Sequence, residues 1–109
     1  MNHVTLAGQL ERLRQEATWR SKGHHAITLT KEPGLCLVLM LFGKGAKLAE
    51  HRAAGPLTFH VLSGSVTFRT GARAETVRSG EVVVLEAAIV HDVEALEESA
   101  CLLTLAGAA

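Results

Sequence analysis

Two different spacings of apolar residues divide the chain into a short helical part and a longer β-part. Over residues 5–20, Leu6, Leu10 and Leu13 recur at helical spacing while charged side chains occupy the other side, and Thr5 can cap the first turn. We therefore predict one amphipathic helix over residues 5–20, packed on the outside of the remaining structure.

After this helix the apolar residues fall into short runs that are rich in Val, Leu, Thr or Phe and mostly bounded by Gly, Pro or Ser. The predicted strands are residues 26–30, 35–42, 58–62, 65–70, 82–85, 89–95 and 100–105. Regularly spaced short strands with glycine turns are typical of a sandwich or barrel rather than a parallel α/β sheet. We predict an all-β antiparallel β-sandwich or jelly-roll barrel over about residues 26–106, within a single domain of residues 1–109.

The run from Leu35 to Phe42 contains no polar residue. A strand with one face in water alternates between apolar and polar side chains, and this run does not. We predict that this strand is buried on both faces, with one face towards the interior and the other against a helix or a second subunit.

The composition excludes several partners and chemistries. Lys and Arg together number 11, as do Asp and Glu, which gives no basic face for nucleic acid and no polybasic membrane anchor. No apolar run approaches a membrane span and the first residues lack the order of a signal peptide, so we expect a cytoplasmic protein. Cys36 and Cys101 are expected to be small core residues rather than a disulfide. The chain has no Tyr, which excludes a tyrosine general acid.

Two glycine-framed segments carry the candidate chemistry. The first runs from Gly45 through His51 to Gly64, and the second runs from Gly80 through His91 to Ala95. Together they resemble the two motifs of the cupin family, which folds as a double-stranded β-helix. In that family the first motif has a Gly, five residues, His-x-His, a Glu and a closing Gly, and the second has a Gly, Pro-x-Gly, a His and an Asn. The resemblance covers roughly the last two-thirds of the chain and implies a small single-domain cupin of the RmlC-like kind.

The match is partial at the positions that bind metal in the family. Carried over residue by residue, His51 and His91 fall at two histidine positions of the motifs. Ala53 stands at the second His of the first motif, and Leu57 stands at its Glu. Three positions of the second motif also depart from the pattern: Glu86 replaces Pro, Ala88 replaces Gly and Ala95 replaces Asn. The ligand set that the resemblance implies is halved.

His51 and His91 supply two candidate metal ligands, whereas protein sites for Zn, Fe, Mn or Ni usually have three or four. His60 is a tentative third ligand. Alternation from Leu57 would point His60 to the opposite face, whereas a bulge near residues 55–56 would turn it inward. Two interpretations stay open: a weak site for a divalent transition metal (Zn, Ni, Mn or Fe), or two buried, hydrogen-bonded imidazoles that bind no metal.

Alternate residues of a strand point to the same face, and the side chains expected to point into the barrel define a candidate ligand pocket. Its predicted lining is His51, Ala53, Leu57, Phe59, His91, Val93 and Ala95. This narrow, mostly apolar cavity would suit a small apolar or aromatic acid. Arg52 and Arg69 could offer a cation to a carboxylate, and Glu86 or Glu94 could orient an imidazole, although surface exposure is the simpler interpretation of all four.

These residues bear on three possible functions. A metal-dependent cupin enzyme (a dioxygenase, isomerase or decarboxylase) would use His51, His91 and His60, but half of the usual ligand set is missing. A sugar-nucleotide epimerase of this fold would need a Tyr. We therefore expect a small-molecule-binding cupin with no assigned catalytic residue, and whether it catalyses a reaction stays open. The resemblance and the apolar sheet surface also predict a homodimer.

Overall fold

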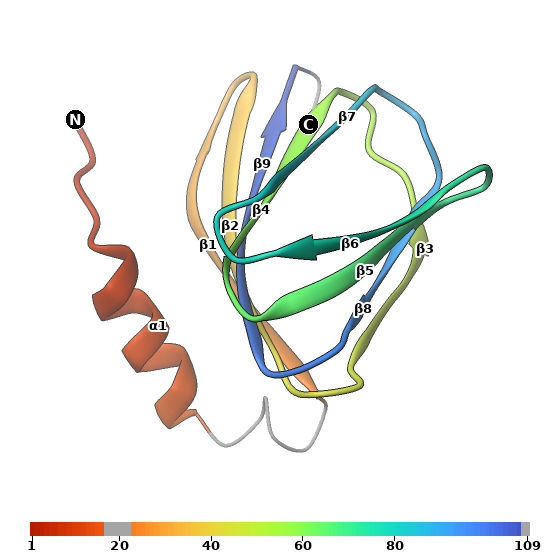
Figure 1. Cartoon of the computed structure of the whole chain (residues 1–109). Helices are drawn as coiled ribbons and strands as arrows, with labels where there is room; N and C mark the ends of the chain where they lie inside the picture. Colours follow the sequence, from red (N-terminus) through yellow and green to blue (C-terminus); the bar gives the residue numbers. More distant parts are fainter. Residues whose placement is uncertain (17–22, 108–109) are drawn as a thin grey trace.

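The computed structural model describes residues 1–16 and 23–107, which form one helix and two antiparallel β-sheets (Figure 1). The elements are α1 Leu6–Gln15, β1 His24–Glu32, β2 Leu35–Phe42, β3 Lys47–His51, β4 Leu57–Ser63, β5 Ser65–Thr70, β6 Ala74–Arg78, β7 Val82–Leu85, β8 His91–Ala95 and β9 Ser99–Ala106. The predicted all-β jelly roll with a single N-terminal helix is confirmed.

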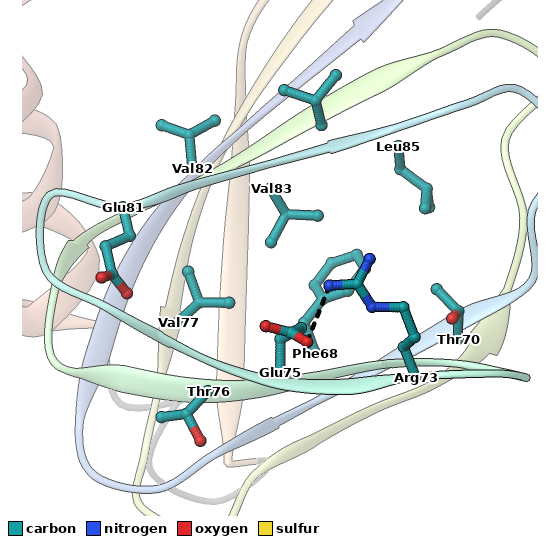
Figure 2. Close-up of a pocket in the computed structure, with 11 residues that line it drawn as sticks. Phe68, Thr70, Arg73, Glu75, Thr76, Val77, Glu81, Val82, Val83 and Leu85 are labelled. Carbon is teal, nitrogen blue, oxygen red and sulfur yellow. Dashed lines mark hydrogen bonds and ion pairs between the residues drawn. The ribbon is translucent and has the colours of Figure 1, made fainter.

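The two sheets face each other, and on one side their edge strands are not paired with one another. Sheet A has the strand order β1-β2-β9-β4-β7, and sheet B has the order β3-β8-β5-β6. β6 and β7 are therefore edge strands, and the turn at residues 79–81 joins them. A cavity of about 630 Å³ lies between these two edges (Figure 2).

Alternating side chains fill the interior between the sheets. On β4, Leu57, Phe59 and Val61 are buried. Thr58 and His60, which alternate with them, are half-buried. The ring of Phe59 meets the ring of Phe68 from sheet B with centroids 5.5 Å apart and planes tilted by 55°. This cluster joins the inner faces of the two sheets into one core.

Strand β2 is buried on both faces towards its C-terminal end, and the helix supplies the second contact. Met40 and Phe42 belong to the core between the sheets. Leu39 and Leu41 point to the other side, where they pack with Leu13 of α1. Helix α1 thus covers part of the outer face of sheet A (Figure 1). Of the two occupants predicted for this face, the helix is the one found.

Helix α1 is shorter than predicted, and its expected cap is wrong. Thr5 precedes the helix with extended backbone and makes no side-chain cap hydrogen bond. The helix ends at Gln15 because Glu16 is already extended, at φ −79° and ψ 127°. His25 Nε2 lies 2.6 Å from a carboxylate oxygen of Glu16 and ties this end to β1. Residues 17–20 of the predicted helix lie outside the described residues.

Both cysteines are free thiols, in agreement with the expectation that they do not form a disulfide. Cys101 is buried in the core between the sheets, and burial raises the pKa of its thiol to about 12. Cys36 is only half-buried. The part of the chain that the structure describes contains no helix long and apolar enough to cross a membrane.

Candidate functional site

The two glycine-framed segments bring their histidines together at one end of the barrel. His51 ends β3, His91 begins β8, and the two residues are paired across the strands. Their rings meet edge-on, with centroids 4.2 Å apart and planes at 61°. His91 is only 3% exposed, whereas His51 is half-buried.

A β-bulge in β3 creates this pairing. Leu48 pairs with Val93, so an uninterrupted register would place Glu50 opposite His91. The register shift between Leu48 and His51 adds one residue and brings His51 to that position instead. The inward direction of His51 therefore depends on an irregularity that strand alternation alone would not predict.

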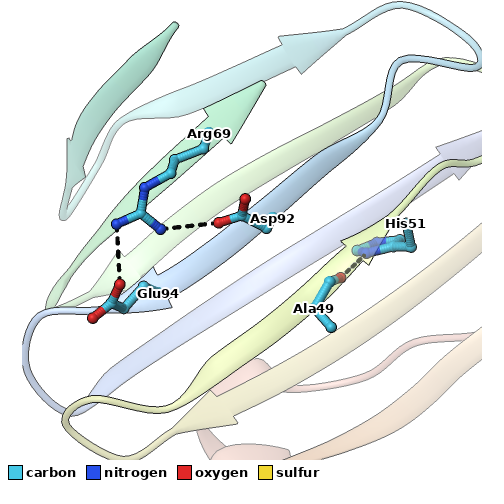
Figure 3. A network of polar contacts seen from close by, with 5 residues as sticks. All are labelled: Ala49, His51, Arg69, Asp92 and Glu94. Carbon is cyan, nitrogen blue, oxygen red and sulfur yellow. Dashed lines mark hydrogen bonds and ion pairs between the residues drawn. The ribbon is translucent and has the colours of Figure 1, made fainter. Parts of the chain in front are cut away.

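Each imidazole is held by a backbone carbonyl two residues earlier. The Nδ1 atom of His51 lies 2.9 Å from the oxygen of Ala49 (Figure 3), and the Nδ1 atom of His91 lies 3.0 Å from that of Ile89. A carbonyl oxygen only accepts, so Nδ1 carries the proton in both rings. In the neutral form, Nε2 of each ring is then the nitrogen that can accept a hydrogen bond or bind a metal.

The environment of His91 favours its neutral form. Its ring stacks on Phe68, with centroids 5.2 Å apart and planes within 8° of parallel. Burial lowers the pKa of His91, and the nearby His51 lowers it further, although the hydrogen bond to Ile89 and the charge of Asp92 act in the opposite direction. The buried imidazole is thus suited to accept a hydrogen bond rather than to carry charge.

A cavity of about 310 Å³ opens beside His51. Its lining residues are His51, Arg52, Ala53, Ala54, Leu57, Leu103 and Leu105. The leucines and alanines make an apolar wall, and Arg52 supplies a cation. No ion pair joins Arg52 to another residue within the described ranges, so this guanidinium has no carboxylate partner there.

The structure brings part of the predicted pocket to this cavity. His51, Ala53 and Leu57 line it, and His91 lies against His51. Three predicted lining residues instead belong to the buried core between the sheets: Phe59, Val93 and Ala95. The leucines of β9 were missed because neither glycine-framed segment contains them. In the sequence, only the apolar run that begins at Ala100 indicated that these leucines belong to a strand. They reach the cavity because β9 pairs with β4, with Leu105 opposite Leu57.

His60 does not join the other two histidines. Strand β4 alternates regularly from Leu57 to Val61, and its register shift comes only after Val61. His60 therefore points away from the interior, on the outer face of sheet A.

Arg69 also lies away from the cavity, on the outer face of sheet B. Its guanidinium makes ion pairs of 3.0 Å with both Asp92 and Glu94 (Figure 3). Glu94 thus partners an arginine rather than an imidazole, and Glu86 is exposed. Of the two candidate cations, only Arg52 reaches the cavity.

The donor atoms at this end of the barrel fall short of a usual transition-metal site. Within residues 1–16 and 23–107, no three His, Cys, Asp or Glu side chains are grouped so that they could hold a metal ion. His51 and His91 offer two nitrogens, while Ala53 and Leu57 offer no donor atom. Sites with three or four protein ligands are the norm, and the described residues do not fit one.

No protein-family model matches the chain, and neither does any curated protein sequence. Solved structures do match it. An RmlC-like cupin protein from Desulfovibrio desulfuricans is 21% identical, with a TM-score of 0.76 over 97% of this chain and 95% of that one. A conserved protein of unknown function from Streptococcus pyogenes is 23% identical, with a TM-score of 0.74 over 79% of this chain and 75% of that one.

A third structure is more similar in sequence but longer. It is a cupin 2 conserved barrel domain protein from Leptotrichia buccalis, 33% identical, with a TM-score of 0.73. The match covers 76% of this chain and 40% of that one. These likenesses establish the fold of the chain, and a fold alone does not determine a ligand.

Proposed function

Because this chain has the fold of a small cupin, we propose that it binds a small carboxylic acid with an apolar or aromatic body in the cavity beside His51. The observation that carries the proposal is the composition of that cavity. One arginine without a carboxylate partner and one imidazole stand at a wall made otherwise of leucine and alanine. An anionic group with an apolar body complements such a lining.

Each part of the ligand has a counterpart in the cavity. The guanidinium of Arg52 offers a planar set of donors to a carboxylate. Leu57, Leu103 and Leu105 offer an apolar surface to the body of the ligand. The Nε2 atom of His51 accepts a hydrogen bond from a hydroxyl or amine on the ligand, since its Nδ1 proton is held by Ala49.

The size of the cavity limits the ligand. A volume of about 310 Å³ is at the small end of the range for ligand pockets. A single aromatic ring or a short branched chain is the body that we expect, and a nucleotide or a disaccharide is too large.

Binding is favoured over metal-dependent catalysis because of the donor set. A metal-dependent enzyme, the alternative for this fold, would have to work with His51 and His91, since His60 faces away. In its neutral form, an imidazole that donates through Nδ1 can accept a hydrogen bond from a ligand at Nε2 without any metal.

The test is ligand binding measured by isothermal calorimetry and by the shift in melting temperature. Benzoate is the probe, and benzamide, which has the same body without the charge, is its control. We expect saturable binding of benzoate that raises the melting temperature, because a ligand of the native state stabilises it. Arg52→Gln should abolish this binding, whereas Arg73→Gln, which removes an exposed arginine away from this cavity, should leave it unchanged.

Elemental analysis of protein purified without an affinity tag separates the two functions. One equivalent of a transition metal that is lost in a His51→Ala/His91→Ala double variant would contradict the binding proposal and favour the enzyme. Benzoate binding that survives Arg52→Gln would also contradict it, because the carboxylate would then be held elsewhere.

A further inference from the structure

The larger cavity, between β6 and β7, is lined differently from the one beside His51. Its floor is apolar and comes from both sheets: Phe68, Val77, Val83 and Leu85 point into the space between the two strands (Figure 2). Val82 and Val84 also line it, although strand alternation directs their side chains to the outer face of sheet A. β7 is an edge strand, so we infer that their main-chain groups border the cavity.

The hydrogen bonds at the start of β7 fix which main-chain groups face this cavity. Gly80 has φ +85° and donates to the oxygen of Val61, while the oxygen of Glu81 accepts from the Val61 N–H, the arrangement of a G1 bulge. Hydrogen-bonded pairs alternate along an antiparallel ladder, so Val83 bonds to β4. The N–H and C=O groups of Val82 and Val84 therefore point to the free edge.

The same reasoning applies to β6. The N–H of Thr70 donates to the oxygen of Arg73, which sets the alternation of the β5–β6 ladder. The main-chain groups of Ala74, Thr76 and Arg78 then face the cavity. The Glu81 side chain accepts from the Arg78 N–H at 2.7 Å and closes one end of the cavity. Ala74 and Thr76 keep donors and acceptors that no described strand pairs with.

The edge of β7 carries none of the side chains that normally prevent strand pairing, although the strand is short and begins at a bulge. Natural edge strands carry lysine, proline or an inward-pointing charge. β7 reads Val82-Val83-Val84-Leu85, and Val82 and Val84 are 50% and 76% exposed. An uncharged β-branched strand with free main-chain groups is a template for another strand.

We propose that this cavity binds an extended peptide of another protein, about four residues long, by β-strand addition to β7. Its main chain would pair with Val82 and Val84, and its alternate side chains would be apolar and rest on Phe68, Val77, Val83 and Leu85. A length of about four residues matches Val82–Leu85 and Ala74–Arg78. This site is separate from the small-molecule cavity, since neither His51 nor Arg52 lines it.

The probe is the synthetic peptide acetyl-Thr-Val-Thr-Val-Thr-amide, a soluble strand with apolar alternate residues. Main-chain pairing tolerates many sequences, so this peptide should bind saturably at millimolar concentration or below. Amide hydrogen exchange measured by NMR should slow about tenfold or more at Val82 and Val84 when the peptide is bound. The same peptide with every amide N-methylated cannot donate main-chain hydrogen bonds and should not bind.

A pair of variants tests the main-chain contact. Val84→Pro removes an edge N–H that the ladder with β4 does not use, and proline is tolerated at such positions. It should weaken peptide binding about tenfold. Val84→Thr keeps the N–H, and its affinity should match the native chain. If the proline variant does not fold, the exchange measurement and the N-methylated peptide still decide.

Three results would overturn the proposal. The first is the absence of saturable binding, or equal binding of the N-methylated peptide. The second is amide exchange at Val82 and Val84 that the peptide does not change, together with changes in the NMR chemical shifts of Ala53 and Leu57. The peptide would then bind in the small-molecule cavity. The third is an intermolecular NMR contact between the amides of Val82 or Val84 and a strand of a second copy of the chain, which would assign the edge to that copy.

Discussion

The backbone N–H of Ala88 donates a hydrogen bond of 2.9 Å to the carbonyl oxygen of Ala53. This bond ties the loop that precedes His91 to the loop that follows His51, and so connects the two glycine-framed segments at the small-molecule cavity. Ala88 has φ 65°, and among the described residues it is the non-glycine residue with a positive φ. In the cupin motif that this chain resembles, the corresponding position is a Gly.

Replacing Ala88 with Gly should stabilise the protein. The left-handed conformation strains a residue with a Cβ atom, and glycine adopts it freely. The flexibility that glycine adds to the unfolded chain offsets part of this gain, so we expect about 0.5–1 kcal/mol from denaturant unfolding. Ala87→Gly, at a position without positive φ, is the control and should lower stability. A destabilised Ala88→Gly variant would contradict this account of the loop.

Acid should destabilise the native state through His91. Its pKa in the folded protein is lowered, chiefly by burial, while unfolding returns it to its usual value of about 6.5. Below about pH 6.5 the unfolded chain therefore binds more protons than the native chain, and stability falls as the pH decreases through and below that value. Melting temperatures between pH 8 and 5 should show this loss, and His91→Gln should reduce it.

Gly64 should tolerate no side chain. It has φ +87°, and a Cβ atom there would overlap the Oγ atom of Ser99 and the carbonyl oxygen of Glu98. Glu98 directly precedes β9, and the buried Ser99 is the first residue of that strand, so neither neighbour can move freely. Gly64→Ala should cost roughly 2–4 kcal/mol of unfolding free energy. Gly71→Ala, with open space around it, should change stability by less than about 1 kcal/mol.

The homodimer stays a prediction, and the outer face of sheet A is where we expect it. Helix α1 covers one part of that face, while Val82 and Val84 on β7 are largely exposed. Light scattering after size-exclusion chromatography should give twice the chain mass of 11.6 kDa. Val82→Lys should shift the protein to monomer, and Thr67→Lys, on the outer face of sheet B, should not. A native chain that is monomeric at micromolar concentration would contradict the prediction.

The fold was predictable because the strands that build the core have clear apolar patterns. β2, β4, β5 and β9 all lie close to their expected bounds. β3 and β6 were missed, since charged residues such as Glu50 and Glu75 interrupt their apolar alternation. Both strands are at the edges of sheet B, where one side of the strand needs no partner.

The candidate site was predictable only in part, for a different reason. Motif spacing identified His51 and His91. The bulge that turns His51 inward is a shift in the pairing of β3 with β8, and no residue of β3 indicates it in the sequence. Leu103 and Leu105 reach the cavity through pairing with β4, which is distant in the chain. Arg52 and Arg69 could not be told apart from the sequence, because Arg52 lines the cavity and Arg69 pairs with Asp92 and Glu94 only in the folded chain.

Strand β2 takes part in two separate cores, with Met40 and Phe42 on one side and Leu39 and Leu41 on the other. Loss of the helix would therefore uncover the back of a central strand, and loss of the barrel would leave the helix with nothing to pack on. We therefore expect the two parts to melt together. A thermal scan followed at helical and at sheet wavelengths should consequently trace one and the same transition.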